Sequence, residues 1–310
     1  MINFRYHIVS LMAVFLALSV GIAVGVTLGS SVDQGLTDAA VQDRKQVQDL
    51  RVELDRRQVL DEYRDAYATR AGAILTEAVL ADERVALVVM PDAPNAVVDT
   101  LAAAITQSGG TLTRTVTINT SAFDPSKAAD HQAAIDDKFG QDLGFIASMS
   151  RATKLGLAVG RSLLSKTTAE RDTLASDITT SLTDARMVSV NDDSTAQAQL
   201  VIVVTAEAIE PRPAPEQVAA HVETDIALST FAAGVVVAGP NSDNIDGTDV
   251  LQVRINAVSA NLLSTVDVAD LSSGVTTVIL AGKEQLLGRQ GRHYGALTRA
   301  DAPAPELPVR

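Results

Sequence analysis

Side chains that bind metals or transfer protons are few in this sequence, and they lie far apart along it. No two of the four histidines are spaced as ligands on one element. They are His7, His131, His221 and His293. The absence of cysteine excludes disulfides, thiolate zinc sites and cysteine nucleophiles. Soft ligands select Cu(I), and the methionines form no cluster. We therefore expect no catalytic residues, no metal ligands and no cofactor, although a copper site assembled from distant residues stays open.

Two loops follow predicted buried strands, which is where parallel sheets usually bind ligands. They are MPDAPN at 90–95 and AGPNSDN at 238–244. Neither contains the glycine pattern that cradles a dinucleotide or a phosphate. Asp92, Asp243 and Asp246 could bind a cation there, but solvated carboxylates in turns are the more common case.

Motifs of enzymes are also missing. GLAVGRS at 156–162 resembles a phosphate-binding loop only superficially, because it has three spacers in place of four and Arg161 in place of lysine. No serine-hydrolase, β-lactamase or metalloprotease motif occurs. We expect a protein that is not an enzyme, with an enzyme hidden in the fold as the weaker alternative.

The elements between residues 84 and 298 indicate an α/β domain. Short apolar runs alternate with helical segments, which is typical of a mostly parallel, Rossmann-like sheet with helices on both faces. The runs are 84–90, 111–118, 185–190, 198–206, 234–239 and 264–270. The proline-rich residues 299–310 are predicted to be a disordered tail.

Residues 8–29 form the longest apolar segment, with no charge in 22 positions. As a helix they would span roughly 33 Å, enough for a hydrocarbon core of about 30 Å. We expect a transmembrane anchor, with a cleaved signal or a buried core helix as the alternatives. The positively charged Arg5 precedes this segment, and positive charge favours the cytoplasmic side. We therefore expect a single-pass protein of the cell membrane, with residues 1–7 in the cytoplasm and the bulk of the chain extracytoplasmic.

Small residues repeat every four positions in this segment. Ala17, Gly21, Gly25 and Gly29 would line one side of the helix, where a second helix could approach closely in lipid. The spacing predicts packing against a partner helix or a second copy, although glycine and alanine are common in membrane helices in any case.

Residues 30–83 are predicted to be a coiled-coil stalk. Val47, Leu50 and Leu54 fall on the a and d positions of a heptad repeat, and the rest of the stretch is densely charged. Asp43 and Arg57 interrupt the repeat. We expect a parallel homodimer, with a solvated helix folded onto the α/β domain as the alternative.

Charge patterning gives one further candidate surface. The chain carries a formal net charge of −13, which argues against a nucleic-acid partner. Lys283, Arg289 and Arg292 form a basic island that could dock an acidic partner or wall polymer. A solvated helix end explains the same residues without a partner.

The first 29 residues, MINFRYHIVSLMAVFLALSVGIAVGVTLG, and the glycine-spaced LLGRQGRHYG at 286–295 resemble the mycobacterial copper transport protein B family of actinobacteria. The resemblance covers essentially the whole chain. It implies copper efflux or copper resistance, and some members are described as outer-membrane channels. Related corynebacterial proteins imply instead a role in cell separation.

Anchor, heptads and missing catalytic motifs together favour a dimeric, non-enzymatic cell-envelope protein. It would bind an envelope or membrane protein partner, and the resemblance to the corynebacterial proteins implies that this serves the control of cell separation and wall hydrolysis. The alternative is copper transport or efflux and copper resistance, as the family name implies.

Overall fold

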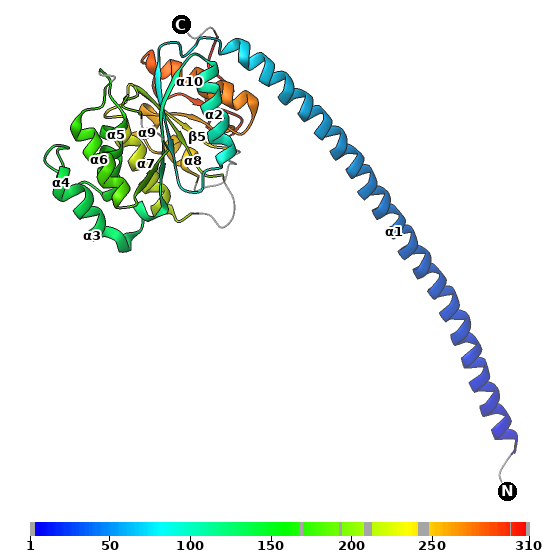
Figure 1. The fold of residues 1–310 in the computed structure, drawn as a ribbon. Coiled ribbons are helices and arrows are strands. Elements are labelled where there is room, and N and C mark those ends of the chain that lie inside the picture. Colours follow the sequence, from blue (N-terminus) through cyan, green and yellow to red (C-terminus); the bar gives the residue numbers. More distant parts are fainter. Residues whose placement is uncertain are drawn as a thin grey trace. The chain divides into compact units, whose positions relative to one another are not determined.

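The computed structural model (Figure 1) describes the chain between residues 4 and 307 apart from 168–169, 192–193, 208–212, 241–247 and 298. Within the first helix, the side chains of residues 4–6 and 27–43 are not described. The chain divides into two compact units, Met1–Arg64 and Asp65–Arg310. Each unit is described by itself below.

Helix α1 runs without interruption from Phe4 to Leu75 and makes up the first unit and the beginning of the second. No proline occurs in this range to break it. Among the described residues, the stretch His7–Val26 alone is long and apolar enough to cross a membrane, judged by length and composition. Its described side chains are all exposed.

A seven-stranded sheet forms the centre of the second unit, in the order β3-β2-β1-β4-β5-β6-β7. All neighbouring strands are parallel except β3, which runs antiparallel to β2. The strands are β1 Arg84–Val89, β2 Thr111–Ile118, β3 Val188–Val190, β4 Leu200–Val204, β5 Gly234–Ala238, β6 Ser264–Val266 and β7 His293–Tyr294. Strands β2 and β3 are added on one side of β1 and strands β4 to β7 on the other, so the order of strand addition reverses between β1 and β4. Doubly wound sheets usually bind ligands at this switch point.

Helices cover both faces of this sheet (Figure 1). One face packs against α2 (Asn95–Gln107) and α10 (Ser272–Leu286). The other face packs against α5 (Arg151–Leu163), α6 (Thr173–Asp184), α7 (Pro215–Leu228) and α8 (Asp249–Ile255). The short helices are η1 Thr120–Ala122, η2 Pro125–Lys127, α3 Ala128–His131, η3 Gln132–Asp136, α4 Asp137–Phe139 and α9 Ser259–Leu262. Burial on both faces explains why β1, β4 and β5 are apolar without alternation.

The α/β fold and the mostly parallel sheet are therefore confirmed, with local corrections. The predicted strand 185–190 is wrong in its first half, because Ala185 and Arg186 form the turn that ends α6. Helix α8 ends at Ile255, and the side chain of the next residue, Asn256, accepts bonds from the backbone amides of Val258 and Ser259 at the start of α9. The helix within the predicted stalk 30–83 ends at Leu75.

The proline-rich tail also differs from the expectation. Ala302 forms a β-bridge with Tyr294, and the Asp301 amide donates to the His293 carbonyl at 2.7 Å. Pro305 is buried. Residues 299–307 are consequently not a disordered tail, because their backbone bonds continue the edge of the sheet at β7.

Candidate functional site

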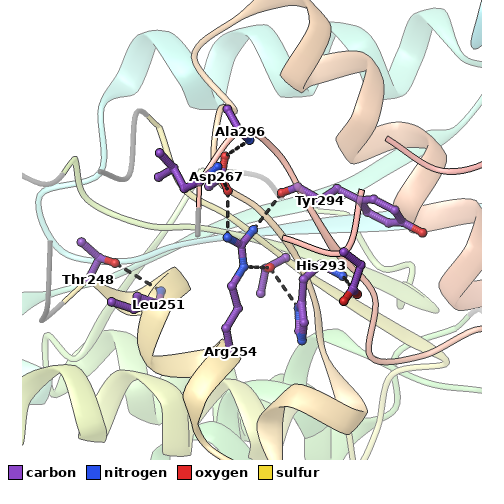
Figure 2. A network of polar contacts seen from close by, with 10 residues as sticks. Thr248, Leu251, Arg254, Asp267, His293, Tyr294 and Ala296 are labelled. Atoms are coloured by element: carbon purple, nitrogen blue, oxygen red, sulfur yellow. Dashed lines mark hydrogen bonds and ion pairs between the residues drawn. The ribbon is translucent and has the colours of Figure 1, made fainter. Parts of the chain in front are cut away.

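A buried ion pair lies at the carboxyl end of β6, the edge of the sheet where ligands are expected (Figure 2). Arg254 of α8 reaches Asp267, which follows β6 directly, with an N–O distance of 2.8 Å. The Arg254 side chain is 2% exposed and that of Asp267 is not exposed at all. Charges this deeply buried need further partners to offset their desolvation.

Those partners come from two segments, β6 and the segment after α10. The other two guanidinium nitrogens of Arg254 donate to the Thr265 hydroxyl and the Tyr294 carbonyl, each at 2.8 Å. The Asp267 carboxylate accepts from the backbone amides of Ala296 at 2.9 Å and Leu297 at 3.2 Å. The network thus joins α8, β6 and the segment after α10, and we name it the Arg254–Asp267 lock.

The glycine-spaced segment 286–295 takes part in this lock. Gly295 has a φ of +136°, and a Cβ there would overlap the Asp267 carboxylate. His293 lies beside the lock, with its Nδ1 3.1 Å from the Thr265 hydroxyl. The Tyr294 hydroxyl donates a hydrogen bond to Glu284. Burial is the larger cause, and this bond the second, of a raised pKa of the phenol. With their polar groups occupied by the protein, these side chains hold the fold together.

A second buried cluster, formed by His221, Asp225 and Asp249, contains polar atoms that lack hydrogen-bond partners among the described residues. His221 of α7 places Nδ1 3.1 Å from both carboxylate oxygens of Asp249, the first residue of α8. The Phe123 ring lies against the imidazole, with 4.5 Å between ring centroids. Within the described part of the chain, His221 Nε2 and both oxygens of Asp225 are buried without a hydrogen-bond partner. Burial, and then the charge of Asp249, raise the pKa of Asp225 well above its ordinary value.

The His221–Asp249 contact has the form of a metal-ligand support. A carboxylate that accepts from Nδ1–H leaves Nε2 free to bind a metal. However, the described residues contain no group of three or more histidine, aspartate or glutamate side chains placed to hold a metal ion. Asp243 and Asp246, considered from the sequence, lie outside the described residues.

The remaining candidate ligands are dispersed. Burial lowers the pKa of His131 and of His293, so both imidazoles are neutral at neutral pH, the form that binds metals. They lie on α3 and β7 respectively. Met90 and Met187 are buried in the apolar core. Asp92 is exposed in the loop after β1.

The helix-packing candidates of the first unit are exposed where they are described. A Cβ added at Gly21 or Gly25 would meet no atom within 4 Å, so this chain's own described packing does not require glycine there. Ala17 is exposed too, and the surroundings of Gly29 lie outside the described residues. Val47, Leu50 and Leu54 are 49%, 55% and 63% exposed.

Two of the three residues of the basic island form ion pairs within the fold. Lys283 pairs with Glu83 at 2.9 Å, and Arg289 lies 3.5 Å from Glu284. Arg292 is exposed. Arg289 is exposed too, and partner docking at this island stays a prediction.

Comparison with known proteins decides the family. The family described as copper transport outer membrane protein, MctB, matches residues 1–305. This chain belongs to that family. Proteins named copper transporter MctB from Mycobacterium bovis and Mycobacterium tuberculosis are each 27% identical to it over 317 residues, covering 95% of this chain and 96% of theirs. The Mycobacterium leprae protein of the same name is 26% identical over 311 residues, with the same coverage.

Membership in the MctB family confirms the resemblance found in the sequence. The family description and the apolar N-terminal helix indicate a membrane-associated protein. The relatives' names refer to copper transport, and neither these names nor the family description mentions cell separation. The comparisons therefore favour copper transport, the alternative in the sequence analysis, over control of cell separation.

Proposed function

We propose that this protein acts in copper transport and copper resistance at the cell envelope, from a single N-terminal membrane anchor. The match of the MctB family to residues 1–305 carries this proposal. The apolar helix His7–Val26 supports the membrane anchor. Copper is the cargo in this proposal. The chain contributes by binding an envelope or membrane protein partner, and it catalyses no reaction.

Deleting the chain from cells that carry it is expected to make growth sensitive to a several-fold lower copper concentration. Copper should then accumulate in the cells, because its removal is impaired. Growth across a copper series and cell copper content by mass spectrometry measure both effects, and the full chain supplied in trans should restore them. Unchanged tolerance and unchanged copper content would contradict the proposal.

The same strain distinguishes copper handling from a general envelope defect. A chain that maintains the envelope alone would, when deleted, raise sensitivity to detergent and to copper together. We expect copper sensitivity without increased detergent sensitivity. Parallel increases in both would indicate an indirect role, such as one exerted through the wall.

The membrane topology is part of the proposal. The single Arg5 side chain and the terminal amine precede the anchor, whereas the first basic residues after it, Arg44 and Lys45, follow three aspartates. Positive charge is retained on the cytoplasmic side. The N-terminus would therefore be cytoplasmic and the α/β unit extracytoplasmic, available to an envelope or membrane protein partner.

We further propose that two copies pair through α1 as a parallel coiled coil. Large apolar side chains at a and d positions bury themselves against the same positions of a second helix. Val47, Leu50 and Leu54 are all exposed on the isolated helix, which is the state such a seam has before pairing. The small residues Ala17, Gly21 and Gly25 would permit close packing of the two anchors in the same orientation.

The cysteine-free sequence allows a direct test of this pairing. In membranes, Val47→Cys is expected to form a disulfide-linked dimer rapidly, because equivalent a positions lie within disulfide distance in a parallel coiled coil. Val52→Cys is a matched control, since Val52 is also exposed but five residues further along, on the outer side of the seam. Equal cross-linking of the two variants, or none, would contradict a parallel coiled coil.

A further inference from the structure

An open cavity of about 650 Å³ lies where α3, α4 and the end of α6 meet. These helices lie together at one end of the second unit (Figure 1). Three cationic side chains line the cavity, from Lys127, Lys138 and Arg186, together with the carboxylates of Asp130 and Asp184. The hydroxyls of Ser121 and Ser181 and the buried His131 complete the polar lining. Cations thus gather here although the whole chain is acidic.

Arg186 occupies a backbone position that ordinarily belongs to glycine. It has a φ of +56° and follows the last turn of α6. Its amide donates to Thr183, and the next amide, that of Met187, donates to Leu182, which is the Schellman arrangement of a helix end. A non-glycine residue in this conformation is strained.

Two other helices of the chain end with the same pair of bonds and do use glycine. Gly109 with a φ of +82° closes α2, and Gly288 with a φ of +80° closes α10. The exception at α6 is therefore a residue that destabilises its own turn. Strain of this kind is often kept where the side chain has a function, and here that side chain borders the cavity.

Local contacts hold the backbone of Arg186 and the ammonium groups of the two lysines. The Arg186 carbonyl accepts bonds from the Asn119 amide at 2.9 Å and the Ser121 hydroxyl at 2.8 Å, which hold the strained turn. Lys138 donates to the Ser181 hydroxyl at 2.8 Å, so its ammonium is held at the cavity wall. Lys127 lies 3.5 Å from Asp130, an exposed pair that balances one of the carboxylates.

We infer that this cavity binds the phosphate group of a small anionic molecule, with Arg186 as the principal contact. A guanidinium donates two parallel hydrogen bonds to a phosphate, and lysines add point charges. The cavity volume leaves room for more than the phosphate alone. This site is independent of the copper proposal, since phosphate recognition requires no metal ligand.

Calorimetric titration of the purified full chain in detergent, with glycerol phosphate and with inorganic phosphate as probes, tests the inference. Arg186→Gly should weaken binding about tenfold or more, the effect of losing a charge-assisted pair of bonds. The same variant should resist urea as well as the parent or better, because glycine relieves the positive φ. Weaker binding would then not be a consequence of unfolding.

Arg299→Gly is the matched control, because Arg299 is also an exposed arginine with a positive φ, of +67°, and does not line the cavity. Its affinity for the probes should equal that of the parent. Lack of binding by the parent chain would overturn the inference. Equal losses in the two variants would also overturn it, since they would show a general charge effect in place of a site.

Discussion

Replacing Asp267 by alanine is expected to lower the free energy of unfolding of the α/β unit by about 3–5 kcal/mol. The substitution leaves the Arg254 guanidinium buried without its counter-charge and removes the acceptor of two backbone amides. Both losses occur where water cannot replace the missing bonds. Natural domains have a total stability of about 5–15 kcal/mol, so this one side chain accounts for a large share.

Urea unfolding of the full chain in detergent, followed by pulse proteolysis, measures the loss. Asp130→Ala is the control within the same unit, because Asp130 pairs with Lys127 at 3.5 Å with side chains 64% and 52% exposed. We expect at most about 0.5 kcal/mol from that exposed pair. Similar shifts in the two variants would show that the Arg254–Asp267 lock does not stabilise the fold through its burial.

The central strands were predictable from sequence because their burial leaves a plain pattern. A strand covered on both faces is apolar at every position, as Val85–Val89 and Leu200–Val204 are. Strand β2, between β1 and β3, alternates instead, and its burial alternates with it from Arg114 to Ile118. In these strands the pattern of apolar residues therefore predicts which side chains are buried.

The edge at β7 was not predictable in this way. His293 and Tyr294 form a strand of two residues, too short for any periodic pattern. They pair because distant groups hold them, including Arg254 on the Tyr294 carbonyl and Ala302 in a bridge. Contacts of this range leave no local signal, which is also why the proline-rich sequence of the tail predicts disorder.

The pairing of Arg254 with Asp267 is not predicted from the sequence, although each residue is unusual for its position. Arg254 is a lone cation in an apolar helical stretch, and Asp267 lies inside the predicted apolar strand 264–270, both signals of a buried pair. The sequence did single out the glycine spacing of 286–295, but only as a family resemblance. The structure supplies its physical reason at Gly295, where the backbone passes against the Asp267 carboxylate.

The second large effect is expected at Asp225, where Asp225→Asn should stabilise the protein at neutral pH. Both carboxyl oxygens of Asp225 are buried without a partner in the described chain, and the charge of Asp249 acts on them. Burial, together with the charge of Asp249, therefore raises the pKa of this carboxyl well above the ordinary 3.8. Asparagine has nearly the same shape and is neutral at every pH.

The pH dependence gives the sign of this effect. Below about pH 4 the carboxyl is protonated in both the folded and the unfolded chain, so the parent and the variant should have similar stability. As the pH rises, the unfolded chain releases the proton and the folded chain retains it. The parent then loses about 1.4 kcal/mol per pH unit until the folded pKa is reached, and Asp225→Asn does not.

Urea midpoints of the two proteins between pH 4 and pH 7 measure that divergence. Asp177→Asn, an exposed aspartate of α6, should follow the parent throughout and serves as the control. Parallel curves for the parent and Asp225→Asn would mean that Asp225 ionises normally in the folded chain, which requires a partner that offsets its burial. Diverging curves would establish a neutral buried acid beside His221 and Asp249. Because natural proteins seldom leave such a group unpaired without a use for it, this cluster would then be the next position to test in copper-exposed cells.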